Sequence, residues 1–576
     1  MRRMGGLCPL NTEGAIIVQS DLTVLLDERC PSAHAVREQL HRFAEARKRA
    51  GSIHTYRITP MTLWHALDEG WTVELAIETL KANSKFGVPL QAEGMIRLWG
   101  RRYGKLRLYA EDGALLLNGD AAALEALKHL PRIMAWVEAV RSPELWQLAP
   151  DSRGLLKQEL ARQGYPVMDY AGYHTGESLP VRLREQTLKG VSFALRDYQE
   201  GAVGSFIQDG AARGGSGVVV LPCGTGKTVV GIAALARLGA ATLILTSSRT
   251  SAEQWKDELL DKTTLAADSV GLYNGQTKEV KPVTIATYQL LTRRKSKEGE
   301  FLHIGLFNER DWGLIIYDEV HLLPAPVFRM TASIQATRRL GLTATLVRED
   351  GCAEDVYSLI GPKQYDMQWK EAEKGEYIAA VSCAEIRVPL DASQHPRYAA
   401  AAPRSRLRIA AENPGKLPVV RELLEQYRDK QTLVIGQYLG QLREVAGELG
   451  APLLTGETPH EERLQLYDQF RSGSIPVLVV SKVANLAIDL PDASVAIQLS
   501  GSFGSRQEEA QRVGRLLRPK QGENRAWFYT LVTDGTKETE FALKRQLFML
   551  EQGYEYMQLS AADARASRVQ SEAANG

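Results

Sequence analysis

Cysteine is scarce and scattered in this sequence. The five cysteines form no C-x-x-C pair; they are Cys8, Cys30, Cys223, Cys352 and Cys383. Cysteine-based metal sites and disulfide frameworks need closer or repeated spacing, so neither is indicated. The simplest interpretation is a protein of a reducing interior, and we expect it to be cytoplasmic.

Long apolar runs and an excess of one charge are also missing. No apolar stretch reaches the length of a membrane span, and the first apolar run is broken at Asp21 before it could form a signal-peptide core. The formal net charge is +1. We therefore expect no membrane association and no global attraction to nucleic acid, so that DNA binding would need a local basic groove.

The length of 576 residues exceeds what one hydrophobic core usually serves, so we expect several domains. Short strand-like runs, three helices and a hairpin turning at Asp112-Gly113 predict an α+β, winged-helix-like module over residues 1–120. Such modules bind DNA or dock proteins, and both interpretations stay open. Residues 121–185 contain helical pieces and loops, typical of a small adapter.

Two α/β halves follow. Continuous apolar runs such as "GVVVLP" and "GLIIYDE" alternate with helical segments, which favours parallel sheets buried on both faces. We place these halves at residues 186–388 and 413–556, joined by a linker at 389–412. The small, polar residues 557–576 are expected to be disordered.

The turn "LPCGTGKT", residues 221–228, lies between an apolar strand and a helix. Backbone N–H groups of such a loop cradle phosphates, here around Gly224, Thr225 and Gly226. Lys227 would reach the β- and γ-phosphates, and Thr228 would ligate Mg²⁺. Leu221 departs from the strict pattern, which begins with glycine, so an ordinary glycine-rich turn is the alternative.

A second candidate element is "WGLIIYDEVH", an apolar strand that ends in acidic residues. Open α/β sheets bind ligands at such strand ends. Asp318 is the candidate Mg²⁺ ligand, Glu319 the candidate group that orients or deprotonates water, and His321 a further catalytic candidate. The alternative is an acidic strand end that only caps a helix.

The third element, "QEEAQRVGRLLRPK", contains the catalytic candidates Gln511, Arg515 and Arg518. The two arginines are three residues apart and share one helical face, from which they could act as arginine fingers across a cleft. Taken alone, they are more typical of a solvated basic face. Together with the loop and the acidic strand end, they predict a two-lobed ATPase that uses ATP and Mg²⁺.

These motifs resemble helicase superfamily 2, in order, from about residue 190 to about 555. "FALRDYQ", "TSSRTSAEQW", "ATYQLL", "TAT", "IGQY" and "SKVANLAIDLP" are further matching stretches. The resemblance implies two tandem RecA-like domains, with Gln199 and Asp489 at the nucleotide. It also implies DNA-phosphate contacts by Ser247, Arg249, Thr287 and Lys482.

Within the superfamily, "DEVH", "LTATLVRED", "SKVANLAIDLPDASVAIQ" and "KRQLFMLEQGY" resemble the XPB family of repair and transcription helicases. The resemblance implies a 3′-to-5′ DNA helicase that acts on single-stranded and forked DNA in repair, with a nuclease as a possible partner. Arg348, Glu349 and Asp350 resemble the element with which this family opens duplexes. The thumb, at 389–412, is short, and the damage-recognition region is reduced to 121–185.

Three other functions stay open from the sequence. One is a double-strand DNA translocase that does not separate strands by itself, and another is an RNA helicase of the DExH type. The third is a scaffold in which ATP only sets the conformation of a repair assembly. Stimulation by DNA or RNA, strand displacement, and repair by a Glu319→Gln variant would separate them.

Overall fold

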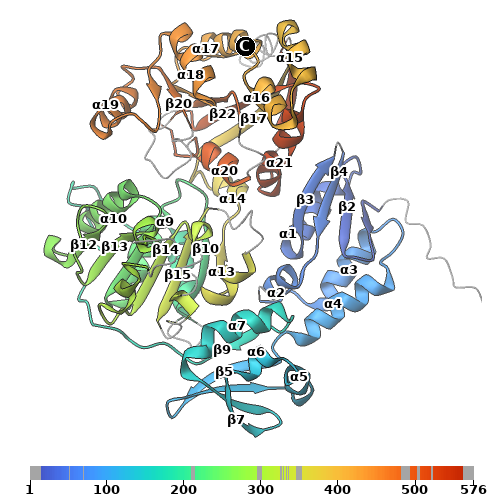
Figure 1. Cartoon of the computed structure of the whole chain (residues 1–576), viewed down its shortest axis with the longest axis vertical. Coiled ribbons are helices and arrows are strands. Elements are labelled where there is room, and N and C mark those ends of the chain that lie inside the picture. Colours follow the sequence, from blue (N-terminus) through green and yellow to red (C-terminus); the bar gives the residue numbers. More distant parts are fainter. Residues whose placement is uncertain are drawn as a thin grey trace, which may run out of the picture.

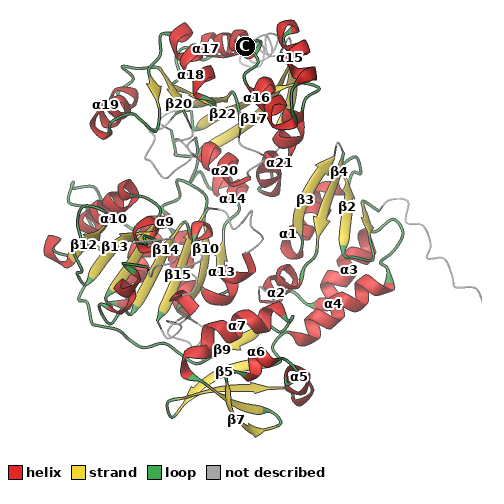
Figure 2. Ribbon diagram, viewed as in Figure 1, coloured by secondary structure: helices red, strands yellow, loops and turns green. Residues whose placement is uncertain are grey.

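The computed structural model describes residues 14–50, 52–68, 70–208, 214–294, 301–324, 327, 330–332, 334, 337–344, 353–481, 493–501, 506–514, 516–520, 523–554 and 556–561. In this part of the chain the strands form four sheets, each accompanied by helices (Figures 1 and 2). None of the described helices combines the length and apolar content of a membrane span.

The N-terminal sheet is antiparallel, in the order β1-β2-β4-β3. Its strands are β1 (Ile16–Val18), β2 (Thr23–Asp27), β3 (Glu45–Ala50) and β4 (Ile53–Arg57), and its helices are α1 (Ala33–Phe43), α2 (Pro60–Asp68), α3 (Val73–Asn83) and α4 (Leu90–Arg102). Thr72 caps α3 by accepting a hydrogen bond from the Leu75 N–H. The α+β character is confirmed, but a winged-helix-like module is not.

The predicted hairpin is present, with β5 (Leu106–Glu111) antiparallel to β6 (Ala114–Gly119) and Asp112-Gly113 at the turn. However, it lies in a five-stranded sheet ordered β7-β8-β6-β5-β9, away from β1–β4. The other elements of this unit are α5 (Ala121–Leu127), α6 (Pro131–Met134), β7 (Val137–Ser142), β8 (Leu145–Leu148), α7 (Arg153–Arg162) and β9 (Val167–Asp169). The hairpin thus shares its sheet with the predicted adapter, because its partner strands come from that segment.

The first lobe is a seven-stranded parallel sheet in the order β12-β13-β11-β14-β15-β10-β16. Its strands are β10 (Ser216–Val220), β11 (Thr242–Thr246), β12 (Val270–Tyr273), β13 (Val283–Thr287), β14 (Leu314–Asp318), β15 (Arg338–Thr343) and β16 (Lys363–Asp366). Its helices include α8 (Asp197–Ile207), α9 (Lys227–Leu238), α10 (Arg249–Lys262), α11 (Tyr288–Leu291) and α13 (Ala353–Leu359).

The second lobe is also a seven-stranded parallel sheet, in the order β19-β20-β18-β21-β22-β17-β23. Its strands are β17 (Ala380–Val388), β18 (Thr432–Ile435), β19 (Leu453–Leu454), β20 (Val477–Val480), β21 (Val495–Gln498), β22 (Arg525–Thr533) and β23 (Tyr556–Ser560). Its helices include α14 (Trp369–Lys374), α15 (His395–Ala400), α16 (Pro403–Ala411), α17 (Lys416–Gln426), α18 (Leu439–Leu449), α19 (His460–Arg471), α20 (Arg506–Gly514) and α21 (Lys537–Glu551). The two tandem RecA-like domains are therefore confirmed.

Two expected segment limits differ from this architecture. Strand β17, which we assigned to the first α/β half, pairs with β22 along its whole length and belongs to the second sheet. The expected tail at 557–576 begins inside β23, whose residues pair with β17. Apolar strands of the two sheets have the same local pattern, so only long-range pairing decides which sheet each one joins.

The expected thumb-like linker folds onto the second lobe. The Thr533 hydroxyl, at the end of β22, donates to the carbonyl of Ala410 in α16 at 2.6 Å. The Arg406 guanidinium donates to the backbone carbonyls of Ala399 and Ala401, both at 2.9 Å. Residues 389–412 therefore form two short helices, and Arg406 stabilises the backbone where one helix ends and the next begins.

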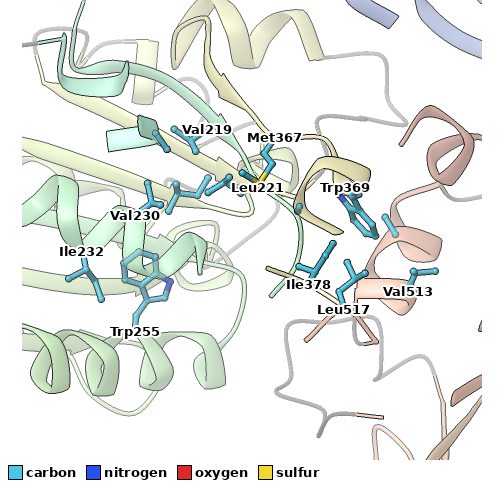
Figure 3. Close-up of a cluster of buried hydrophobic side chains, with 14 of the residues drawn as sticks. Val219, Leu221, Val230, Ile232, Trp255, Met367, Trp369, Ile378, Val513 and Leu517 are labelled. Atoms are coloured by element: carbon cyan, nitrogen blue, oxygen red, sulfur yellow. The ribbon is translucent and has the colours of Figure 1, made fainter. Parts of the chain in front are cut away.

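An apolar cluster extends from one lobe to the other (Figure 3). It contains Val219 and Leu221 of the first lobe, and Ile378, Val513 and Leu517 of the second. Met367 and Trp369, on the segment that joins the two sheets, also belong to it (Figure 3). Because these side chains are buried together, the second lobe packs directly against the start of the 221–226 loop.

Candidate nucleotide and DNA sites

The loop between β10 and α9 has the backbone geometry of a phosphate-binding turn. Gly224 and Gly226 have φ values of 84° and 82°, in the left-handed region that favours glycine. A Cβ at Gly226 would lie 2.8 Å from Nε2 of Gln199, so that amide would have to shift. Lys227 and Thr228 are the first two residues of α9, as the motif requires.

Residues before the first α/β unit hold this loop in place. The Tyr198 hydroxyl and the Gln199 amide both donate to the carbonyl of Thr225, at 2.6 and 2.9 Å. Gln199 Oε1 accepts from the backbone N–H of Arg196 at 3.0 Å and so caps α8. The structure therefore places Gln199 against the loop, with its amide engaged by the backbone; its role toward adenine stays a prediction.

Asp318 ends β14, between β11 and β15 in the sheet. Burial, reinforced by the negative charge of Glu319, raises the pKa of the Asp318 carboxyl to about 6, and the Trp255 hydrogen bond and the Lys227 charge oppose this shift. Glu319 adopts a left-handed conformation with φ of 50°. The turn after the strand therefore gives the two consecutive carboxylates different backbone conformations.

His321 connects the acidic strand end to the end of β15. It is 5% exposed, and its Nδ1 lies 2.7 Å from Oγ1 of Thr343 and 3.4 Å from Oε2 of Glu319. The carbonyl of Thr343 accepts from the backbone N–H of Leu221 at 3.0 Å, at the start of the phosphate loop. Hydrogen bonds thus run from the acidic strand end through Thr343 to the loop.

Helix α20 of the second lobe lies on the phosphate loop. A Cβ at Gly514 would lie 2.6 Å from Sγ and 2.8 Å from Cβ of Cys223. A Cβ at Gly224 would lie 3.6 Å from the backbone and side chain of Arg518. One predicted finger, Arg518, is therefore beside the loop, whereas the fully buried Arg512 donates to Gln498 and anchors α20 to its own sheet.

The predicted DNA contacts in the first lobe cluster at neighbouring strand ends. Ser247 follows β11, and Thr287 ends β13, in register with Thr246 across the ladder. Arg249 starts α10 and is half exposed, with its guanidinium paired to Glu253 at 2.8 Å. Thr287 is 7% exposed, so of these three Arg249 is the most accessible.

Several predicted site residues lie outside the described part of the chain. They are Arg348, Glu349, Asp350, Lys482, Asp489 and Arg515, together with the side chain of Gln511. Their proposed roles stay predictions.

Three residues at the site were not singled out from the sequence. The Trp255 indole N–H and the Ser251 hydroxyl donate to Oδ2 of Asp318 at 3.0 and 3.3 Å. The Tyr288 hydroxyl donates to the backbone carbonyl of Asp318 at 3.0 Å. Ser251 and Trp255 lie inside the motif "TSSRTSAEQW" four residues apart, and this helical spacing was the available signal.

A parallel-sheet lobe with a phosphate loop and an acidic strand end, in contact with a second such lobe, is the architecture of a two-lobed RecA-like ATPase. The family model described as ERCC3/RAD25/XPB C-terminal helicase matches residues 372–574. Proteins named DNA 3′-5′ helicase XPB from Kineococcus radiotolerans and Mycobacterium tuberculosis are each 48% identical over 96% of this chain, covering 97% and 99% of their own lengths. The chain belongs to the XPB family of DNA helicases.

Other comparisons agree with this assignment. The model described as type III restriction enzyme, res subunit, matches residues 192–348 in the first lobe. A model described as helicase conserved C-terminal domain matches residues 16–138. A protein of Antonospora locustae, named general transcription and DNA repair factor IIH helicase/translocase subunit XPB, is 33% identical over 96% of this chain and 82% of its own length.

Proposed function

We propose that this chain is an ATP-dependent 3′-to-5′ DNA helicase that acts in DNA repair. The observation that carries the proposal is the direct contact of α20 with the phosphate loop, through Gly514 and Cys223. A second lobe seated on the loop of the first is the arrangement in which hydrolysis can move two lobes along a strand. The identity of 48% to proteins named DNA 3′-5′ helicase XPB supports the substrate and the direction.

ATP would bind at the loop between the lobes. Lys227 would contact the β- and γ-phosphates, and the N–H groups of the loop around Gly224 and Gly226 would cradle them. Arg515 and Arg518 would meet the γ-phosphate from the second lobe. Both arginines come from the segment that follows α20, so the charge reaches the phosphate only when the lobes are together.

Mg²⁺ suits the oxygen groups at this site. The Asp318 carboxylate, at the end of β14, and the Thr228 hydroxyl, at the first turn of α9, would hold it. When bound, the ion would neutralise phosphate charge. Glu319, which has a φ of 50°, would orient or deprotonate the attacking water. His321, which contacts both Glu319 and Thr343, would hold the Glu319 carboxylate in place.

Single-stranded and forked DNA are the proposed substrates. Ser247, Arg249 and Thr287 would contact phosphates on the first lobe, and Lys482 on the second, while Arg348, Glu349 and Asp350 would act at the fork. A nuclease partner and a cytoplasmic location stay predictions from the sequence. The interpretation of residues 121–185 as a small adapter with a reduced damage-recognition region also stays a prediction.

A double-strand DNA translocase is the second candidate. The printed name of the Antonospora locustae relative includes both helicase and translocase, and residues 389–412 fold onto the second lobe as short helices. A chain without an extended thumb has less surface with which to separate strands. Displacement of a labelled strand separates the two candidates, because a pure translocase hydrolyses ATP on duplex DNA without displacing it.

The decisive experiment combines ATPase and displacement assays on 3′-tailed, 5′-tailed and blunt duplexes, with matched RNA. Wild-type protein should displace from the 3′ tail only and should lose ATPase when Mg²⁺ is chelated. Lys227→Ala should lose ATP binding and hydrolysis, and Glu319→Gln should bind ATP but turn it over slowly. Near-normal turnover in either variant, or stimulation by RNA alone, would contradict the proposal.

A further inference from the structure

Helix α10 contributes two hydrogen-bond donors to one oxygen of Asp318. The Trp255 indole N–H lies 3.0 Å and the Ser251 hydroxyl 3.3 Å from Oδ2. The residues are four apart in the helix, so both side chains leave the same face. Two donors on one oxygen fix the rotation of the carboxylate and therefore the direction of its other oxygen, Oδ1.

The Trp255 side chain is held tightly in this position. It is 1% exposed and belongs to the buried cluster that also contains Val230 and Ile232 of α9 (Figure 3). A Cβ at Gly231 of α9 would lie 2.6 Å from the indole Cη2 and 3.1 Å from Cδ1 of Leu342. The helix that begins with the phosphate-binding Lys227 therefore packs against the same indole that bonds to Asp318.

The first turn of α10, which carries Ser251, also carries the predicted DNA contact Arg249. The helix starts at Arg249, and its N-cap, Ser248, accepts a hydrogen bond from the backbone N–H of Ser251 at 3.1 Å. Ser251 thus bonds to the start of the helix through its backbone and to Asp318 through its side chain. A shift of the first turn of α10 must move a donor of the Asp318 carboxylate.

We propose that Trp255 and Ser251 are positioning residues for Asp318, through which α10 transmits the position of its DNA-side end to the Mg²⁺ site. This inference rests on the proposed function, in which Asp318 holds Mg²⁺ and the start of α10 contacts DNA. Groups that orient a metal-binding carboxylate typically contribute about 10- to 100-fold in metal affinity or activity. Loss of either donor should therefore change the Mg²⁺ concentration that the ATPase requires and the stimulation of the ATPase by DNA.

Trp255→Phe tests the inference by removing the N–H while keeping an aromatic ring. We expect the Mg²⁺ concentration for half-maximal ATPase to rise about tenfold and the stimulation by single-stranded DNA to fall. Ser251→Ala should shift both in the same direction by less, because its bond is longer. The KM for ATP at saturating Mg²⁺ should stay within about threefold of wild type, because Lys227 and the loop are untouched.

Trp312→Phe is the matched control. Trp312 is also buried in the first lobe, at 2% exposure, but its indole N–H donates to the carbonyl of Leu306 at 3.0 Å. Its loss should lower thermal stability to a similar extent without changing the Mg²⁺ curve. If Trp255→Phe gave the wild-type Mg²⁺ curve and the wild-type DNA stimulation, the inference would be overturned.

Replacing Trp255 by 3-benzothienylalanine separates hydrogen bonding from packing, because sulfur takes the place of the N–H in a ring of nearly the same shape. We expect it to behave like Trp255→Phe; wild-type behaviour would mean that the indole only fills space. This variant also decides the question if the phenylalanine variant fails to fold. A wild-type ATPase that needs no divalent cation would instead refute the proposed metal site.

Discussion

Replacing Gly514 by alanine tests whether turnover depends on the contact between α20 and the phosphate loop. An alanine Cβ there would lie 2.6 Å from Sγ and 2.8 Å from Cβ of Cys223. Carbon and sulfur atoms pack at about 3.5–4 Å, so the helix and the loop would have to separate by roughly 1 Å. Arg518 follows α20 and lies beside Gly224, so the same shift would move this proposed finger away from the phosphates.

The expected consequence of Gly514→Ala is a loss of rate rather than of fold. A misplacement of about 1 Å can lower turnover about 100-fold, whereas overpacking of a core typically costs about 1–3 kcal/mol, which separation of the lobes would partly relieve. We expect DNA-stimulated kcat to fall by about 10- to 100-fold, with a smaller change in ATP affinity. Steady-state ATPase assays measure the change in turnover, and thermal unfolding of the same preparations measures the change in stability.

Two further variants make this test specific. Gly447→Ala, in α18, has nothing within 4 Å of the added Cβ and should leave turnover unchanged. Cys223→Gly combined with Gly514→Ala removes both clashing atoms and should recover part of the lost rate, which gives a double-mutant cycle with strong coupling. Wild-type turnover in Gly514→Ala, or purely additive effects in the cycle, would show that turnover does not depend on this contact.

Three other predictions concern separate parts of the chain. Asp169→Asn should lower the free energy of unfolding by about 3–5 kcal/mol, because it leaves the buried Arg153 and Lys157 without the carboxylate that they contact at 2.9 and 2.8 Å; Glu448→Gln, in an exposed pair, should change it by less than about 1 kcal/mol. Burial alone would raise the pKa of Asp169, but Lys157 and Arg153 hold this pKa below its ordinary value. The stability that the Asp169 carboxylate contributes should therefore be present above about pH 4 and be lost as the pH falls below it. Urea unfolding at several pH values would measure this loss. Affinity for single-stranded DNA should fall steeply with salt and depend little on sequence, and a flat response in a titration would contradict phosphate contacts. Arg348→Ala should keep DNA-stimulated ATPase but lose forked-duplex displacement; if both fall together, the element belongs to ATPase coupling.

Local spacing was enough to predict the glycine-rich turn and the acidic strand end at which we propose the nucleotide site. The loop geometry around Gly224 and Gly226 and the strand that ends at Asp318 follow from patterns within about ten residues. The hairpin turn at Asp112-Gly113 is local in the same sense, and it is present. In each case the backbone conformation is set by the residues of the motif themselves.

Pairings between distant segments could not be predicted from such patterns. Strand β17 and the hairpin of β5 and β6 were expected in other units, because an apolar strand does not encode which neighbour it will pair with. Trp255 is 63 residues from Asp318 in sequence, and Ser251 is 67, so their shared contact exists only after β11 and β14 have paired. The motif "TSSRTSAEQW" could be recognised from the sequence, but the sequence could not show that the Trp255 indole donates to Asp318.

The sheet order itself explains why events at the DNA side should reach the nucleotide. Across the first lobe the neighbouring strands are β13, β11, β14, β15 and β10, so Asp318 lies between the predicted DNA contacts and the phosphate loop. The Tyr288 hydroxyl, next to Thr287, and the α10 donors bond to Asp318 from one side. From the other side, His321 bonds to Thr343, whose carbonyl accepts from the start of the loop. Because these bonds join the ends of neighbouring elements, Asp318 is one link between the DNA side and the phosphate loop, and the packing of Trp255 on Gly231 of α9 is a second.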